Sequence, residues 1–222
     1  MLENLIVPVL NRYDLLQRML SSIDYPVEHL LIIDNGASVV EHDLSITVPE
    51  VVRHTTYLPM PANLGVAGSW NLGIKSFPYA DRWFIASNDV VFKPNALEKL
   101  SEAHRAEITL AKVFPHWQAF ALGYDAVRRV GLFDEALFPA YFEDNDMARR
   151  AEHHSVPVTY LDVPMDHDNS STLQADDFFQ IRNGETFPSN HNYFADKVAR
   201  EDFGAGGWDV HRRRRNGWER PE

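Results

Sequence analysis

The sequence contains no cysteine, no long apolar run and few basic residues for its length. The absence of cysteine excludes disulfides and thiolate metal sites, and it fits a reducing compartment. No apolar stretch approaches the roughly 20 residues that are needed to cross a bilayer. The first segment, residues 1–8, also lacks the basic region of a signal peptide. We therefore expect a soluble, cytoplasmic protein.

Acidic residues outnumber basic ones, and the formal net charge is −11 at pH 7. This charge argues against a general nucleic-acid binder. The chain has 222 residues, of which 45% are hydrophobic and 12% are aromatic. That length and that apolar content suit one domain with its own core, with or without a small appendage.

A short apolar run, residues 83–86, ends abruptly in Ser87, Asn88 and Asp89. A short apolar run that is flanked by polar residues is typical of a buried strand. Polar residues at the carboxyl end of such a strand lie where open α/β sheets bind ligands. A carboxylate beside an amide suits a hard divalent cation, which prefers oxygen ligands and shares them with phosphate. The alternative is that Asn88 and Asp89 only form a turn.

The first half of the chain alternates between strand-like and helix-like segments. Strands are predicted at 5–9, 30–33, 51–57 and 83–86, and helices at 14–23 and 63–77. This alternation predicts an α/β fold with a mostly parallel, Rossmann-like sheet that is covered by helices on both faces. Because parallel crossovers are almost always right-handed, the strand ends that carry Asn11, Asp34 and Asp89 should share one edge.

The second half of the chain is less regular. Helices are predicted at 94–104, 125–130 and 147–153, and strands at 108–114, 120–123 and 156–161. After Asp162 the pattern weakens, and residues 176–187 and 191–202 have a mixed, partly helical character.

Three glycines, Gly65, Gly68 and Gly73, stand between Asn63 and the end of a predicted helix. Their spacing and their place after the third strand differ from a dinucleotide-binding fingerprint, and the Lys-Ser/Thr pair of a P-loop is absent. Two explanations remain open: the glycines permit tight packing of helix on sheet, or they let a nucleotide approach the backbone.

Three acids, Glu143, Asp144 and Asp146, follow two aromatic residues. Carboxylates this close raise one another's pKa, which favours a general base. The alternative is a solvated helix start, where acidic residues interact favourably with the helix dipole. Further along, His167 could complete a metal site with Asp89, although a lone histidine is more often structural.

In their order along the chain, these motifs resemble the family-2 glycosyltransferases of the GT-A fold, in particular the bacterial rhamnosyl- and galactofuranosyltransferase-like branch. The similarity covers roughly residues 4–172. Each motif is weak alone, but seven in this order are specific. The motifs lie at 11–12, 34–36, 63–73, 87–90, 131–135, 142–146 with Arg150, and His167 with 170–172.

The resemblance implies an inverting transfer of a sugar from a nucleotide-diphosphate donor to a hydroxyl of a glycan or protein, with Mn²⁺ or Mg²⁺ as cofactor. It implies that Asp89 binds the metal with help from His167. Asp144 matches the catalytic acid of the family and is our candidate for the general base, with Glu143 second. The residues assigned to the nucleotide are Pro8, Asn11, Arg12, Asp34, Asn63, Gly65, Asn71 and Asn88.

The chain departs from the family in its metal motif, because residues 87–89 offer a single carboxylate where the family often has two or three. This departure leaves metal dependence open and keeps a non-catalytic nucleotide- or carbohydrate-binding domain as an alternative. A nucleotidyltransferase of sugar activation is the other alternative. Such enzymes usually carry a basic, glycine-rich loop after the first strand, whereas residues 8–12 contain no glycine.

Because the resemblance ends near residue 172, we assign residues 1–172 to the GT-A domain and 173–222 to a helical or irregular extension with a basic tail. Its run Arg212–Arg215 allows at most a peripheral contact with an anionic membrane or acceptor, although a disordered tail is the favoured explanation. Trp117, Tyr141 and Phe142 are candidates to stack on the sugar or the acceptor, and the alternative, plain core packing, is favoured more for Phe142 than for Trp117. A homodimer is left open.

Overall fold

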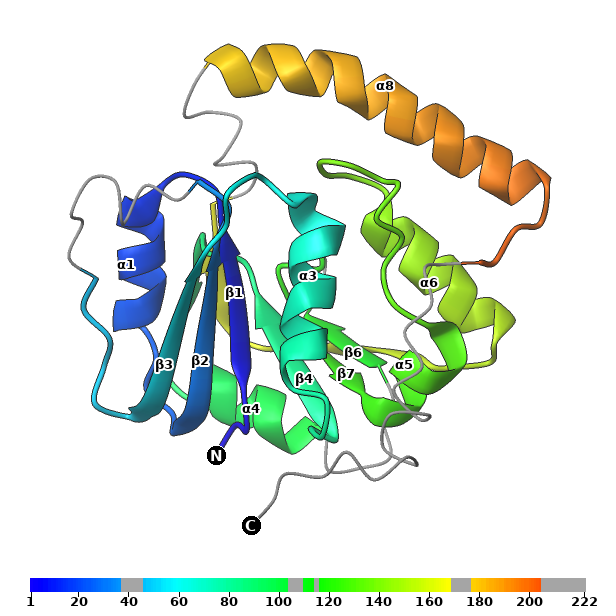
Figure 1. Cartoon of the computed structure of the whole chain (residues 1–222). Helices are drawn as coiled ribbons and strands as arrows, with labels where there is room; N and C mark the ends of the chain where they lie inside the picture. The colour runs from blue at the N-terminus through cyan, green and yellow to red at the C-terminus, as the bar shows by residue number, and fades with distance from the viewer. Residues whose placement is uncertain (37–45, 104–109, 114–115, 169–176, 205–222) are drawn as a thin grey trace.

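The computed structural model describes residues 1–36, 46–103, 110–113, 116–168 and 177–204 (Figure 1). A seven-stranded sheet has the order β3-β2-β1-β4-β7-β6-β8, and β5 and β9 form a small second sheet. The strands are β1 (Leu5–Val9), β2 (Val27–Asp34), β3 (Val52–Pro59), β4 (Arg82–Ala86), β5 (Val90–Phe92), β6 (Leu110–Val113), β7 (Ala119–Gly123), β8 (Val158–Leu161) and β9 (Met165–His167). The helices are α1 (Tyr13–Ser21), α3 (Gly65–Ser76), α4 (Ala96–Ala103), α5 (Tyr124–Val130), α6 (Glu143–His153) and α8 (Asp177–Ala199).

The large sheet is mostly parallel, as the sequence predicts. Strands β3, β2, β1 and β4 pair in parallel, β7 runs antiparallel to β4 and β6, and β8 is parallel to β6. Val9 lies opposite Asp34, and Ile6 lies opposite Ile85. The carboxyl ends of β1, β2 and β4 therefore share one edge, which confirms that part of the prediction.

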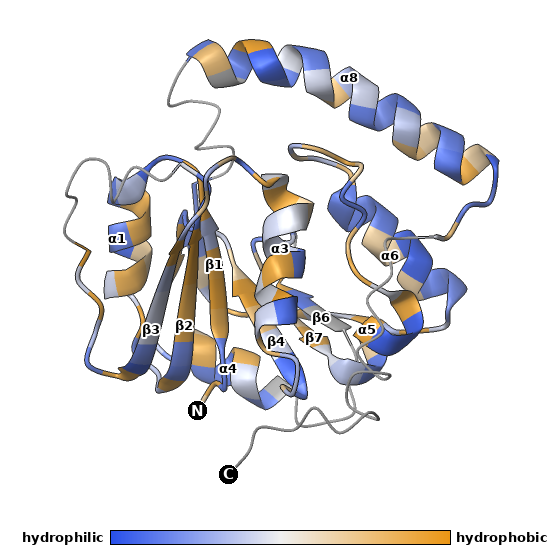
Figure 2. Ribbon diagram, in the orientation of Figure 1, coloured by the Kyte–Doolittle hydropathy of each residue, from blue (hydrophilic) through white to orange (hydrophobic). Residues whose placement is uncertain are grey.

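The sheet is covered on both faces because its buried strands alternate their side chains between two cores. In β1, Leu5, Val7 and Val9 belong to the core with α1 and α4, whereas Ile6 belongs to the core with α3, α5 and α6. Figure 2 shows the apolar side of α1 turned toward the strands. Gly73 of α3 permits the closest approach, since a Cβ atom there would lie 2.4 Å from a methyl group of Ile6. For Gly73, the packing explanation is confirmed.

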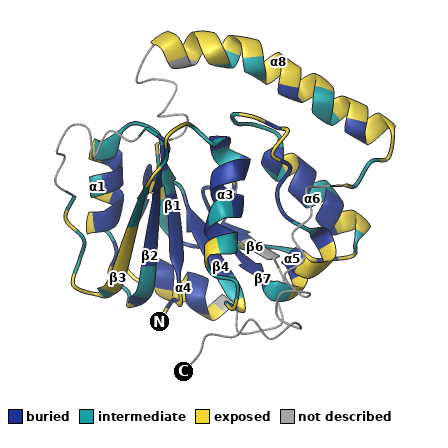
Figure 3. Ribbon diagram, in the orientation of Figure 1, coloured by how far each residue is buried: buried dark blue, intermediate teal, exposed yellow. Residues whose placement is uncertain are grey.

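The helix α8 differs from the expectation of two mixed segments. It runs unbroken from Asp177 to Ala199 with Pro188 inside it. Proline in a helix interior normally ends or kinks the helix, but here the following turns are held by contacts with the main domain. Asn190 donates a hydrogen bond of 2.8 Å to the carbonyl of Ala140. Figure 3 shows that the rest of α8 is largely exposed.

Two parts of the sequence-based assignment lie outside the described residues, namely the domain boundary at 172/173 and the basic run Arg212–Arg215. None of the helices in the described ranges combines the length and the apolar content needed to span a bilayer.

Candidate active site

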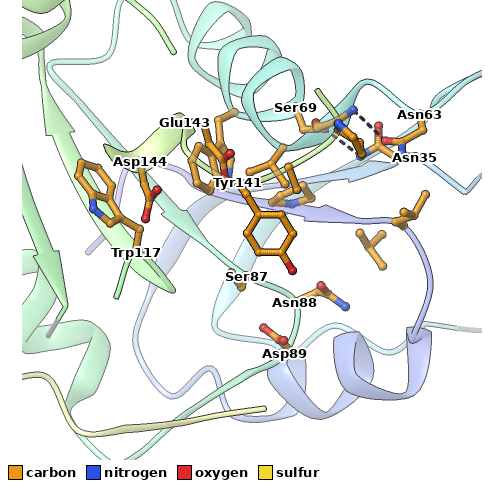
Figure 4. A pocket seen from close by; sticks show the side chains of 18 of the residues that line it. Asn35, Asn63, Ser69, Ser87, Asn88, Asp89, Trp117, Tyr141, Glu143 and Asp144 are labelled. Atoms are coloured by element: carbon orange, nitrogen blue, oxygen red, sulfur yellow. Dashed lines mark hydrogen bonds between the residues drawn. The ribbon is translucent and has the colours of Figure 1, made fainter. Parts of the chain in front are cut away.

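A cavity of about 430 Å³ lies at the shared carboxyl edge of the sheet (Figure 4). This volume falls within the range of small-molecule sites, about 300–1,000 Å³. Both predicted metal ligands, Asp89 and His167, line the cavity together with both predicted catalytic acids, Glu143 and Asp144. Four of the predicted nucleotide residues also line it: Pro8, Asn63, Gly65 and Asn88.

Asparagine side chains shape the loop that leads into α3. The Asn35 amide donates to Ser69 Oγ at 2.8 Å, and its carbonyl oxygen accepts a bond from the backbone of Leu64. Asn63 accepts a 2.8 Å bond from the backbone of Gly65. Gly65 has a φ of +71°, and a Cβ atom there would lie 2.8 Å from the Pro139 loop. The loop at Pro139 lies so close to residue 65 that only glycine fits there. Gly65 also lines the cavity.

Asn71, which was assigned to the nucleotide, makes its hydrogen bonds within the protein. Its side chain is buried, and it exchanges two 2.9 Å hydrogen bonds with the backbone of Phe133. A third bond, of 2.8 Å, joins it to Glu135. These bonds fasten α3 to the loop at 131–135, and Asn71 is not among the residues that line the cavity. Its assignment to the nucleotide stays a prediction.

Asp34, Arg12 and Asn11 are also absent from the lining of this cavity. Asp34 is fully buried at the end of β2, where its carboxylate accepts hydrogen bonds from the hydroxyls of Tyr13 and Tyr57. Arg12 forms a 2.8 Å ion pair with the neighbouring acid, Asp14. The assignment of these residues to a nucleotide therefore stays a prediction.

The small sheet of β5 and β9 brings Asp89 and His167 together. Val90 pairs with His167 in this sheet, which places Asp89 at its end. His167 Nε2 lies 3.3 Å from Asp89 Oδ1, and both side chains are largely buried. Across the described ranges of the chain, no cluster of three or more His, Asp or Glu side chains could hold a metal. A cation here would have these two protein ligands.

The three acids at the start of α6 have three different surroundings. Glu143 is 7% exposed. Burial raises its pKa to about 8, and the negative charge of Asp144 adds to that rise. Its Oε2 has no hydrogen-bond partner among the described residues. Repulsion between like charges, which the acid cluster predicts, contributes to this rise, and desolvation is the larger cause. Glu143 is therefore a neutral acid at pH 7.

Asp144 is half-buried and lines the cavity. Its Oδ1 accepts a 2.8 Å bond from the backbone of Asn145. The ammonium of Lys112 lies over the Trp117 ring at 5.3 Å. Burial lowers the pKa of Lys112, and the charge of Asp144 acts against that change. Asp144 therefore lies at the cavity within the electrostatic reach of the Lys112 ammonium.

Asp146, the third acid, takes part in a buried charge network. It lies 2.7 Å from Arg150 Nε and 2.8 Å from Lys197 Nζ. Lys197 also lies 2.6 Å from Asp134. Burial raises the pKa of Asp134, but the hydrogen bonds from Lys197, Tyr193 and the backbone of Ala136, together with the charge of Lys197, outweigh it. The pKa of Asp134 therefore lies below its usual value. The network joins α8 to α6 two residues beyond Asp144.

The structure resembles solved glycosyltransferases. Mannosyltransferase PcManGT from Pyrobaculum calidifontis, in complex with GDP-Man and Mn²⁺, matches with a TM-score of 0.53 and 14% identity over 96% of this chain and 78% of that one. S. aureus TarS 1–349 matches with a TM-score of 0.60 and 14% identity over 95% of this chain and 68% of that one. The structure of TarS 1–349 in complex with UDP matches with a TM-score of 0.54 and 14% identity over 72% of this chain and 58% of that one. The chain has a GT-A glycosyltransferase fold.

The sequence alone matches no protein-family model and no curated protein. The chain spans less than two thirds of TarS 1–349 in the match with the UDP complex. At 14% identity the similarity establishes the GT-A fold, and the activity has to be argued from the cavity.

Several residues of the GT-A cavity were not identified from the sequence. Ser69 lies on α3, and Arg182, Asn183 and Thr186 lie on α8. The α8 residues belong to a segment without a recognisable motif, and only the folded chain brings them to the sheet edge. Trp117 lines the cavity as expected, whereas Phe142 packs against α8, where its ring stacks 5.7 Å from that of Phe194. Packing, the alternative that was favoured more for Phe142 than for Trp117, is what the structure shows for Phe142.

Replacement of Glu143 by glutamine should change how stability depends on pH. The pKa is 4.5 in the unfolded chain and about 8 in the folded one. The folded state therefore holds the extra proton between these values, and the wild type loses stability as the pH rises from about 4.5 to 8. The pKa difference corresponds to at most about 5 kcal/mol. The Glu143→Gln variant should not lose stability in this way as the pH rises.

Urea unfolding of both proteins at pH 5, 7 and 9 measures the effect. We expect the free energy of unfolding of the variant to rise relative to that of the wild type at each increase in pH. The difference between the two proteins should be largest at pH 9. Parallel pH profiles for the two proteins would contradict a buried, protonated Glu143.

Proposed function

We propose that this chain is an inverting glycosyltransferase that moves a sugar from a nucleotide-diphosphate donor to a hydroxyl of a glycan or protein. One observation carries the proposal: the Asp89–His167 pair and the Asp144 carboxylate line the same cavity at the edge of a GT-A sheet. The motif order supports the family-2 rhamnosyl- and galactofuranosyltransferase-like branch. The cytoplasm is the proposed location, which the lack of cysteine fits.

We assign the nucleotide to the part of the cavity lined by Pro8, Asn63 and Gly65. The hydrogen bonds of Asn35 and Asn63 hold this loop in one conformation, so little order is lost on binding. The donor sugar then extends toward Trp117 and the acids of α6.

Asp89 and His167 fit a divalent cation. One carboxylate and one imidazole are acceptable donors for Mn²⁺ or Mg²⁺, which fill their other positions with phosphate oxygens and water. When bound, such a cation would offset the charge of the departing diphosphate. The family resemblance and the two-residue donor set support this assignment.

The reaction follows from the groups at the cavity. Asp144 accepts the proton of the acceptor hydroxyl as that oxygen forms a bond to C1 of the sugar. The bond between C1 and the diphosphate oxygen breaks, and the diphosphate leaves with the electron pair. Attack on the face opposite to the leaving group inverts C1. Glu143, which is protonated at pH 7, is available to donate a hydrogen bond beside the base.

Replacement of Asp89 by alanine should lower the release of nucleoside diphosphate from the donor by at least about 100-fold. Even residues that only support metal ligands contribute about 10–100-fold to metal affinity or activity. The assay is the release of UDP, GDP or dTDP from the matching sugar nucleotides in Mn²⁺, repeated after addition of EDTA.

Asp166→Ala is the matched control, because Asp166 lies on β9 beside His167 but is exposed and paired with Lys93. It should keep wild-type activity. If Asp89→Ala and EDTA both leave the rate unchanged, the metal assignment is wrong. If the wild type releases no nucleoside diphosphate from any donor with an acceptor extract present, the transferase proposal is wrong.

A further inference from the structure

The N-terminal half of α8 forms one wall of the cavity. Arg182, Asn183 and Thr186 line it from this helix, which lies beyond the carboxyl edge of the sheet in Figure 1. Thr186 bonds back to the helix backbone through its hydroxyl, at 2.9 Å from the carbonyl of Arg182. The wall is therefore polar, and it carries one permanent positive charge.

Arg182 is the single arginine or lysine among the described residues that line the cavity. Its closest described acid is Glu185, at 3.9 Å and itself exposed, which is too far for a hydrogen bond. Its side chain is 52% exposed. A guanidinium presents a planar fork of N–H donors that matches the oxygens of phosphate. This fork is available for a ligand.

The cavity needs such a charge if it is to hold a diphosphate. Asp89 and Asp144 both bring negative charge to its lining, and the candidate metal site supplies one carboxylate and one imidazole. A divalent cation at this pair would offset only part of the negative charge of the departing diphosphate, so some of that charge would remain without compensation. A guanidinium carried by the protein offsets that charge without needing to be recruited from solution.

The position of Arg182 is set from the other end of α8. Lys197 lies in the buried network with Asp134 and Asp146, and Tyr193 donates a 3.0 Å bond to Asp134. Arg182 precedes Lys197 by four helical turns, about 22 Å along the axis. Because a helix is stiff over this length, the anchored end holds Arg182 at the cavity.

We propose that Arg182 binds the diphosphate of the donor and stabilises it as it leaves. This inference rests on the proposed transferase function and adds a protein-borne cation to it. The reduced metal motif and the placement of Arg182 then have one explanation: α8 supplies charge that the single-carboxylate motif does not.

The test is calorimetric titration of the full chain with UDP, GDP and dTDP, in Mg²⁺ and in EDTA. For the nucleotide that the wild type binds, Arg182→Ala should weaken binding by about 10-fold or more, as for the loss of a charge-assisted hydrogen bond. Arg182→Lys should recover part of the affinity, and the corresponding nucleoside should bind all variants alike. Arg200→Ala is the control, because Arg200 directly follows α8 and is exposed in a pair with Asp196.

The outcomes separate the two proposals. If the wild type binds a nucleoside diphosphate and Arg182→Ala binds it equally well, the inference about Arg182 is overturned and the transferase function stands. If the wild type binds none of the three nucleotides, the transferase function itself is overturned.

Discussion

Replacement of Asp144 by asparagine is expected to lower kcat for sugar transfer by about 10²–10⁴-fold, the usual contribution of a positioned general base. Asparagine keeps the shape of the side chain but cannot accept the proton of the acceptor hydroxyl. Binding of the donor nucleotide should stay within about twofold of wild type, since proton transfer is needed only in the transition state. The measurements are steady-state kinetics and nucleotide titration on the same preparation.

Two variants serve as controls for this loss. Asp125→Asn changes an exposed acid in the first turn of α5, and it should leave kcat unchanged. Glu143→Gln should retain most activity at pH 7, because Glu143 is already neutral there. If Glu143→Gln abolishes turnover and Asp144→Asn does not, the roles of the two acids are reversed.

The same experiment separates the alternative functions. A non-catalytic binding domain would bind its ligand equally well with aspartate or asparagine at position 144 and would show no turnover to lose. A nucleotidyltransferase would form a sugar nucleotide from a sugar phosphate and release pyrophosphate. Release of a nucleoside diphosphate with a glycosylated acceptor is the result that we expect.

Replacement of Lys197 by methionine is expected to lower the free energy of unfolding by about 3–5 kcal/mol, the usual effect of removing one partner from a buried ion pair. Lys197 is 1% exposed, and its ammonium contacts Asp134, Asp146 and the carbonyl of Gly204. Methionine fills the space but leaves two buried carboxylates without this partner. Urea unfolding at pH 7 measures the change.

Lys75→Met is the matched control for this stability loss. Lys75 is 40% exposed and lies 3.8 Å from Glu135, so its removal should change stability by less than about 1 kcal/mol. A similarly small change for Lys197→Met would contradict the view that the buried network anchors α8.

The stability that Asp134 contributes should also depend on pH. Its pKa in the folded chain lies below the ordinary value of 3.8. The contribution is therefore present above the unfolded pKa and is lost as the pH falls below it. Because Lys197 is one of the groups that lower this pKa, Lys197→Met should show a smaller loss over the same acidic range.

The central sheet could be predicted because its signals are local. Strands β1, β2 and β4 are short apolar runs that end in polar residues, and the alternation with helices determines their parallel arrangement. The same polar ends led to Asp89, and the acid cluster led to Asp144. Asp89 and Asp144 line the same cavity, as their places in the predicted fold led us to expect.

The features of the site that could not be predicted depend on contacts between segments that are distant in the sequence. Strands β5 and β9 have three residues each, too few for a periodic pattern, yet their pairing brings His167 to Asp89. Asn71 has the composition of a ligand-binding residue but bonds to a loop 62 residues away. The main cause of the raised pKa of Glu143 is burial, which depends on the packed structure rather than on neighbours in sequence.

Calorimetric titration of the wild type with UDP-, GDP- and dTDP-sugars, in Mn²⁺ and in EDTA, tests the central claim most directly. The claim is that one cavity holds a sugar nucleotide between Asp89 and Asp144. It predicts that at least one donor binds in Mn²⁺ with a dissociation constant of about 1 μM to 1 mM. It also predicts that EDTA or Asp89→Ala weakens this binding. Absence of binding by every donor under both conditions would contradict the claim.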